Sequence, residues 1–189
     1  MPEPVLERVC VSYEVCIWDP ARWAPLPQTA DEAVDVMERL TGVADVWNSR
    51  LGDFGVALEQ RYDAEPARVR GAGGLEAFWG CNPRVSTAEC RTALYRMSLP
   101  EEGCSPQLAH VVEAAAAHGL IVFDDETGMC FLPDGSIFPE DMRELWASEL
   151  ASLKLVPRDP AEPAADGRTL LQRIAFELFE SIGRGESRH

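Results

Sequence analysis

Positive charge and long apolar runs are both scarce in this sequence. The 189 residues include 17 lysines and arginines, of which only Lys154 is a lysine, against 32 aspartates and glutamates, so the net charge is −15 at pH 7. Because nucleic acids and anionic membranes are bound by clustered basic side chains, this balance argues against both as partners. The electric field of a negatively charged protein attracts a basic protein, although net negative charge also simply increases solubility.

Features of a membrane anchor or a secretory leader are missing too. No apolar run approaches the roughly 18 residues needed to cross a bilayer. The first residues, Met-Pro-Glu-Pro, lack the basic start and the apolar run of a secretory signal. We therefore expect a cytoplasmic protein.

The sequence also contains none of the common metal-binding or catalytic motifs. The six cysteines form no C-x-x-C pair, and there is no G-x-S-x-G, P-loop or G-x-G-x-x-G motif. His110 and His118 share one predicted helix, but they lie roughly 80° apart around its axis and about 12 Å along it, too far to share an ion. We therefore expect no catalytic residues, no metal and no cofactor. The cysteines are interpreted as buried, reduced thiols rather than as zinc ligands or disulfides.

Hydrophobic periodicity predicts a succession of strands and helices. The predicted strands are residues 9–18, 88–99, 120–123 and 129–132. The predicted helices are about residues 30–41, 47–62, 105–118, 139–153 and 169–182. The first strand alternates as a half-buried strand does, and residues 75–83 are expected to be a loop or a short irregular strand. Trp47 and Trp146 fall on apolar helix stripes, so we expect both in the core.

This order of elements predicts an α+β fold with a mixed four-stranded sheet and helices mainly on one face. The step between residues 88 and 123 is expected to be a right-handed parallel crossover, and the next turn an antiparallel hairpin. Residues 1–156 form the core domain in this prediction, 157–167 a proline-rich linker, and 168–189 a C-terminal amphipathic helix and tail. The apolar stripe of Thr169–Ile182 either packs on the core or joins two copies into a homo-oligomer.

An acidic stretch follows the third predicted strand. Asp124, Asp125 and Glu126 begin one turn, and Asp134 lies in the next. Carboxylates suit Ca²⁺ or Mg²⁺, but the spacing here lacks the alternation of an EF-hand loop, and aspartate is common in turns. The two main interpretations are a solvated turn and a contact surface for a basic partner. In the second, these four residues are the predicted contacts.

An alternative site is predicted at the end of the first strand. Trp18, Asp19 and Arg22 lie close together there, and Trp79 lies in another predicted loop. In open α/β sheets, ligands bind beyond the carboxyl ends of strands, and aromatic side chains with a few polar groups line many ligand sites. These four residues would line a cleft for a small molecule, whereas packing beneath the proline-rich loops is the simpler role for the tryptophans.

Three motifs stand out in the segment 9–153: Ser12-Tyr-Glu-Val-Cys-Ile-Trp18, His118-Gly-Leu-Ile-Val-Phe-Asp124 and Leu132-Pro-Asp-Gly135. In these motifs the segment resembles a family of small, mostly uncharacterised bacterial proteins. The resemblance implies an immunity partner of a secreted bacterial toxin, with no catalytic residues to carry over, and it does not extend beyond Val156. We therefore expect an acidic protein-binding module that blocks a basic toxin by covering its active site. The alternative is a small-molecule-binding or enzymatic α+β domain.

Overall fold

The computed structural model describes residues 13–155, apart from residues 24, 46, 71 and 101–103. The predicted linker, the predicted C-terminal helix and residues 9–12 of the first predicted strand lie outside this part of the chain. The strands are β1 (Tyr13–Trp18), β2 (Leu94–Leu99), β3 (Ile121–Asp124), β4 (Met129–Phe131) and β5 (Ile137–Phe138). The helices are α1 (Pro20–Trp23), α2 (Ala30–Leu40), α3 (Ser49–Ala64), α4 (Ala67–Arg70), α5 (Gly74–Trp79), α6 (Pro83–Glu89), α7 (Cys104–Ala117) and α8 (Met142–Leu155).

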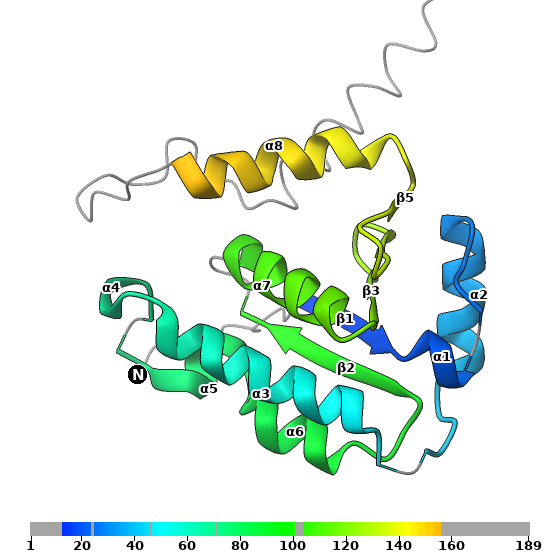
Figure 1. Cartoon of the computed structure of the whole chain (residues 1–189), viewed down its shortest axis with the longest axis horizontal. Coiled ribbons are helices and arrows are strands. Elements are labelled where there is room, and N and C mark those ends of the chain that lie inside the picture. The colour runs from blue at the N-terminus through cyan, green and yellow to red at the C-terminus, as the bar shows by residue number, and fades with distance from the viewer. Residues whose placement is uncertain (1–12, 24, 46, 71, 101–103, 156–189) are drawn as a thin grey trace, which may run out of the picture.

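The strands form one five-stranded sheet in the order β2-β1-β3-β4-β5 (Figure 1). The α+β class is confirmed, and the hairpin between β3 and β4 is antiparallel as predicted. The mixed character was wrong, because every neighbouring pair is antiparallel. β2 and β3 do run in the same direction, but β1 lies between them and pairs with both. The sheet also has a fifth strand, β5, which is too short to give a sequence pattern.

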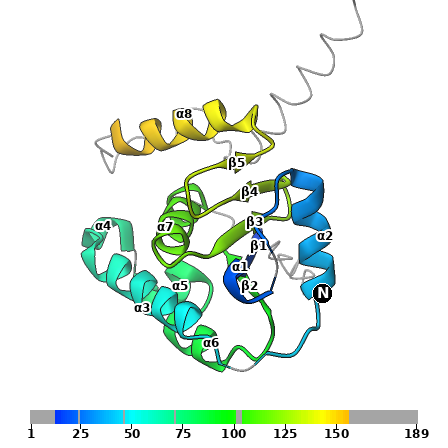
Figure 2. The ribbon, with the colours of Figure 1, turned by 45° about the vertical axis from the view of Figure 1, so that its right-hand side comes forward.

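β1 lies inside the sheet, between β2 and β3, and is buried on both faces. Tyr13, Val15 and Ile17 belong to a hydrophobic cluster with side chains of α3, α5 and α7. Cys16 and Trp18 belong to a second cluster, with side chains of α2. Figures 1 and 2 show α3, α6 and α7 on one side of the sheet and α2 on the other. Helices do lie mainly on one face, but a half-buried first strand was wrong, because α2 covers the second face.

Local signals fixed several helix ends. The hydroxyl of Thr29 accepts the backbone N–H of Glu32 at 3.2 Å and caps α2 at the start that the periodicity predicted. At the end of α7, Gly119 has a φ of 71°, and the N–H of Leu120 donates to the carbonyl of Ala115 at 2.9 Å. This left-handed termination is the one expected of glycine.

Two predicted boundaries were wrong, both in the segment before β2. Residues 88 and 89, predicted to begin a strand, instead end α6. Asn82 caps this helix by accepting the N–H of Val85 at 3.2 Å, and Pro83 occupies its first position. β2 therefore begins only at Leu94. Residues 74–79 form the short helix α5 instead of a loop.

α8 packs on the edge of the sheet through part of its predicted stripe. Met142 and Trp146 are buried, and the ring of Trp146 lies 4.8 Å from that of Phe131 on β4. The core position expected for Trp146 is confirmed. Trp47 is instead 57% exposed, because it precedes α3 rather than lying within it. In the part of the chain described here, no helix combines the length and apolar character needed to cross a membrane.

α3 and α6 cross closely at Gly55. A Cβ atom at this position would lie 2.1 Å from the hydroxyl oxygen of Thr87 and 2.8 Å from the carbonyl oxygen of Pro83. Thr87 is buried and donates to the Pro83 carbonyl at 2.8 Å, so neither atom can move without breaking this bond. The close approach explains a glycine within a helix, where it otherwise costs about 1 kcal/mol relative to alanine.

Replacing Gly55 with alanine is therefore expected to lower the free energy of unfolding by about 2 kcal/mol, because the methyl group forces the two helices apart. Urea denaturation measures the change. Gly52→Ala in the same helix is the matched control: its Cβ would meet only the exposed Trp47 ring, at 3.3 Å, and the change should stay within about 1 kcal/mol. Equal stability of the two variants would contradict the close crossing.

Candidate functional site

Asp124, the first predicted contact residue, is fully buried. Its carboxylate accepts hydrogen bonds from the hydroxyls of Tyr13 and Thr127 and from the backbone N–H groups of Glu126 and Thr127, the last two at 3.1 and 3.2 Å. Burial raises the pKa of this carboxyl, although the hydrogen bonds oppose the shift. Asp124 therefore holds the turn between β3 and β4 and is not a surface contact.

The other predicted contacts do not form one patch. Asp125 and Glu126 lie in the turn that precedes β4, and Asp134 lies in the turn that follows it. Successive turns of an antiparallel meander lie at opposite ends of the strand between them. All three side chains are exposed, but they are divided between the two ends of β4.

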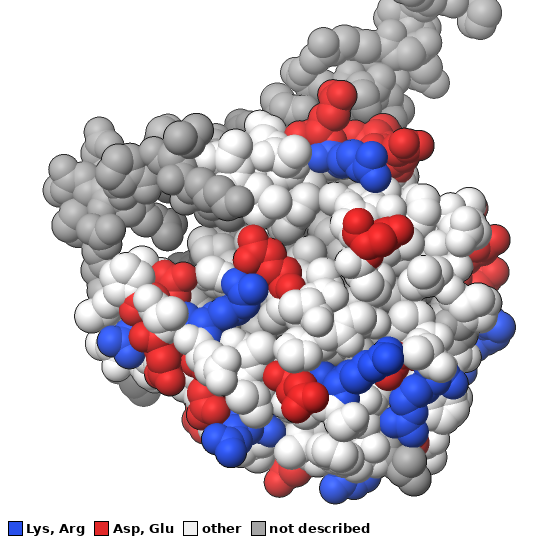
Figure 3. Space-filling model, viewed as in Figure 1, with Lys and Arg blue, Asp and Glu red and all other residues white. Residues whose placement is uncertain are grey.

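Asp134 instead lies near the acidic start of α8. The pKa of its carboxyl is below the ordinary value, chiefly because the backbone N–H of Ser136 donates to it at 2.9 Å, with a smaller contribution from the positive charge of Arg143. Glu140, Asp141 and Glu144 are exposed around Arg143, and Figure 3 shows acidic side chains on either side of a basic one over the start of α8. We call Asp134, Glu140, Asp141 and Glu144 the acidic surface.

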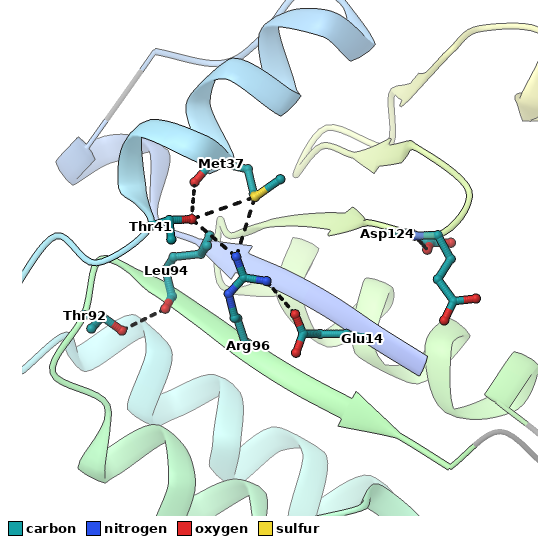
Figure 4. A network of polar contacts seen from close by, with 8 residues as sticks. Glu14, Met37, Thr41, Thr92, Leu94, Arg96 and Asp124 are labelled. Carbon is teal, nitrogen blue, oxygen red and sulfur yellow. Dashed lines mark hydrogen bonds and ion pairs between the residues drawn. The ribbon is translucent and has the colours of Figure 1, made fainter. Parts of the chain in front are cut away.

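Arginines elsewhere are largely matched by acids. Five ion pairs join arginines to carboxylates in the described part of the chain: Arg22–Asp45, Arg50–Asp19, Arg61–Glu113, Arg84–Glu59 and Arg96–Glu14. Arg96 also donates to the hydroxyl of Thr41 at 3.3 Å and so links the sheet to the end of α2 (Figure 4). Within the described residues, no ion pair joins Arg143 or the acidic surface to another charged group, so the negative charge there is not cancelled by such a pair.

The residues predicted to line a ligand cleft are also divided. Trp18 and Trp79 are both buried, Trp18 in the cluster under α2 and Trp79 in the cluster on the opposite face. The two rings therefore cannot line one cleft. Asp19 and Arg22 do lie together, in a surface hollow of about 330 Å³.

This hollow, which we call the Trp47 hollow, is completed by residues that the sequence analysis missed. Trp47, Asn48 and Arg50 line it beside Asp19 and Arg22. Asn48 accepts the N–H of Arg50 at 3.0 Å and caps α3. An N-cap asparagine was a usable signal that Trp47 precedes the helix. The pairing of Arg50 with Asp19, 31 residues away, leaves no sequence signal.

The thiols and hydroxyls of the described residues form no activated nucleophile. Cys16 and Cys130 are free and buried as predicted, and burial raises the pKa of these thiols to about 11 and about 12. The hydroxyls of Ser86 and Tyr95 lie 2.7 Å apart, with the thiol of Cys81 3.6 Å from Ser86. Burial also raises the pKa of Tyr95, so its phenol stays protonated at neutral pH and cannot act as a base.

Metal-binding side chains do not converge in the described part of the chain, where no three histidine, cysteine, aspartate or glutamate side chains are placed to hold an ion. His110 instead lies between α7 and α3, with its Nε2 2.8 Å from the Glu65 carboxylate. Its role there is to join two helices.

Replacing Asp124 with alanine is expected to lower the free energy of unfolding by about 3 kcal/mol, because the buried hydroxyl of Tyr13 and the partly buried donors of Glu126 and Thr127 lose this acceptor. Urea denaturation is the measurement. The exposed neighbour Asp125 provides the control, and Asp125→Ala should change stability by no more than about 0.5 kcal/mol. A loss of the same size in both variants would argue against a structural role for Asp124.

The pH dependence of stability tests the burial of Asp124 separately. Since its pKa is raised in the folded state, its contribution is complete below the ordinary pKa of 3.8 and is lost as the pH rises through the raised value. Asparagine does not titrate, so the stability of the wild type relative to Asp124→Asn should fall from acidic to neutral pH. The opposite slope would show that the hydrogen bonds outweigh burial.

Comparison of the chain with family models, curated protein sequences and solved structures gives no match. Its function is therefore inferred from the acidic surface and the Trp47 hollow themselves.

Proposed function

We propose that this protein is an acidic binding module for a basic protein, of the immunity or antitoxin kind. It would act by covering the active site of a toxin enzyme. The observation that carries the proposal is the acidic surface, where Asp134, Glu140, Asp141 and Glu144 surround Arg143. The motifs in segment 9–153 that resemble a mostly uncharacterised bacterial family, for which the resemblance implies immunity partners, agree with the proposal.

The electrostatics of the acidic surface suit a basic partner. Four exposed carboxylates around the single cation Arg143 leave a net negative charge, which raises the local concentration of a positively charged protein and speeds its association. The arginines of the ion pairs at other sites neutralise much of the remaining charge. The acidic surface is therefore one place where exposed acids outnumber bases; the exposed face of α2, with four acids and Arg39, is another.

Asp125 and Glu126 give a second, smaller group at the other end of β4. They remain candidate contacts, but the acids on α8 do not add to their negative charge. The proposed contact surface therefore keeps Asp134 from the sequence prediction, leaves Asp124 out because it is buried, and adds residues 140, 141 and 144.

The first experiment is a gentle affinity purification of the protein from its native host, which should recover a basic protein in stoichiometric amount. The double variant Glu140→Lys/Glu144→Lys should then weaken the complex by about tenfold or more, mainly through a slower and less salt-dependent association. Surface plasmon resonance at two salt concentrations measures both rate constants.

The matched control is Asp53→Lys/Asp63→Lys on α3, whose two carboxylates are also exposed. Both double variants change the net charge by the same amount, so only the position differs, and the control should weaken binding by no more than about twofold. Thermal melting shows that both variants are folded. Equal weakening by the two would mean that overall charge, rather than the acidic surface, drives association, and no loss in either would reject the surface outright.

A further inference from the structure

We propose that the Trp47 hollow is a binding site for a small planar anion, an aromatic ring that carries a carboxylate or phosphate group. The hollow lies where β1 ends and α3 begins, and it is lined by Asp19, Arg22, Trp47, Asn48 and Arg50. Its volume of about 330 Å³ is at the lower end of the range of small-molecule sites.

The acids in and beside the hollow are turned inward and satisfied. Asp19 is 2% exposed and accepts the N–H of Ala21 and Nη1 of Arg50, each at 3.0 Å, and Nδ2 of Asn48 at 3.3 Å. The side chain of Asp45 is 5% exposed and accepts Nη2 of Arg22 at 2.9 Å and Nε1 of Trp23 at 3.2 Å. Neither carboxylate therefore presents free acceptors to solvent.

The bases of the same two ion pairs lie outside. The side chains of Arg22 and Arg50 are 32% and 48% exposed. A guanidinium group carries five N–H donors. Within the described residues, each of these two groups donates one hydrogen bond to its aspartate. The remaining donors form a fork of the kind that binds carboxylate or phosphate. The amino-terminal end of α3, to which Arg50 belongs, adds partial positive charge.

Trp47 supplies the surface for the ring of the ligand. At 57% it is the most exposed large apolar side chain among the described residues. Its indole lies against α3, since a Cβ on Gly52 would be 3.3 Å from it. An indole face held in the open beside two guanidinium groups can stack on a planar ring while the arginines hold the anion.

This site is independent of the proposed protein-binding function. Its exposed groups are cationic, so they repel the basic partner proposed for the acidic surface. Loss of one activity therefore leaves the other unchanged, and separate variants distinguish them.

The probe is 2-naphthoate, titrated into the full chain labelled with ¹⁵N, and the readout is the indole N–H signal of Trp47 in NMR spectra. We expect saturable binding with a Kd of about 1 mM or below. The uncharged 2-naphthamide and the non-planar cyclohexanecarboxylate should each bind about tenfold more weakly, because each lacks one of the two required features. An absence of saturation, or equal affinity for 2-naphthoate and 2-naphthamide, would overturn the proposal.

Variants test the same site from the side of the protein. Trp47→Ala and Arg22→Gln should each weaken 2-naphthoate binding about tenfold, whereas Arg22→Lys, which keeps the charge but not the fork, should lose less. Val85→Ala and Arg84→Gln on α6 are the matched controls, since both side chains are exposed away from the hollow. These controls should bind as the wild type does. Trp47→Ala removes the indole signal, so binding to this variant is followed by the signal of the Arg50 side-chain Nε–H instead. Wild-type affinity in a folded Trp47→Ala protein would reject the site.

Discussion

The burial of β1 on both faces is the constraint on which the rest of the structure depends. β1 pairs with β2 on one side and β3 on the other, and its side chains alternate between the two hydrophobic clusters. A strand in this position requires helices on both faces of the sheet. α2 therefore has to pack opposite α3 and α7, and the chain between β1 and α3 has to pass around the end of the sheet.

That passage creates the Trp47 hollow. Asp19 directly follows the last residue of β1. Because a buried carboxylate needs hydrogen-bond donors, it accepts hydrogen bonds from Ala21, Asn48 and Arg50. The carboxylate thereby joins the start of α3 to the end of β1. Because the acid is inside and the arginine outside, a neutral ion pair presents a positive face to solvent. In a chain with a net charge of −15, such a face is a local reversal of the overall field.

Burial also decides the roles of Asp124 and Asp134. Asp124 follows a strand whose residues are all buried, so its carboxylate is enclosed and has to collect hydrogen bonds within the turn. Asp134 follows β4 in an exposed turn and stays solvated. The two aspartates, each in a turn that follows a strand, thus differ in role. Asp124 holds the hairpin, whereas Asp134 contributes to a surface that suits a basic partner.

The sequence by itself determined the α+β class, the capping of α2, the glycine termination of α7 and the hairpin from β3 to β4, because each depends on residues close together in the chain. It also placed Trp146 on the buried face of α8. Only the tertiary structure decided that the sheet is wholly antiparallel, that Trp18 and Trp79 lie on opposite faces, and that Arg50 meets Asp19. These features arise from packing between segments far apart in the sequence, for which local periodicity carries no information.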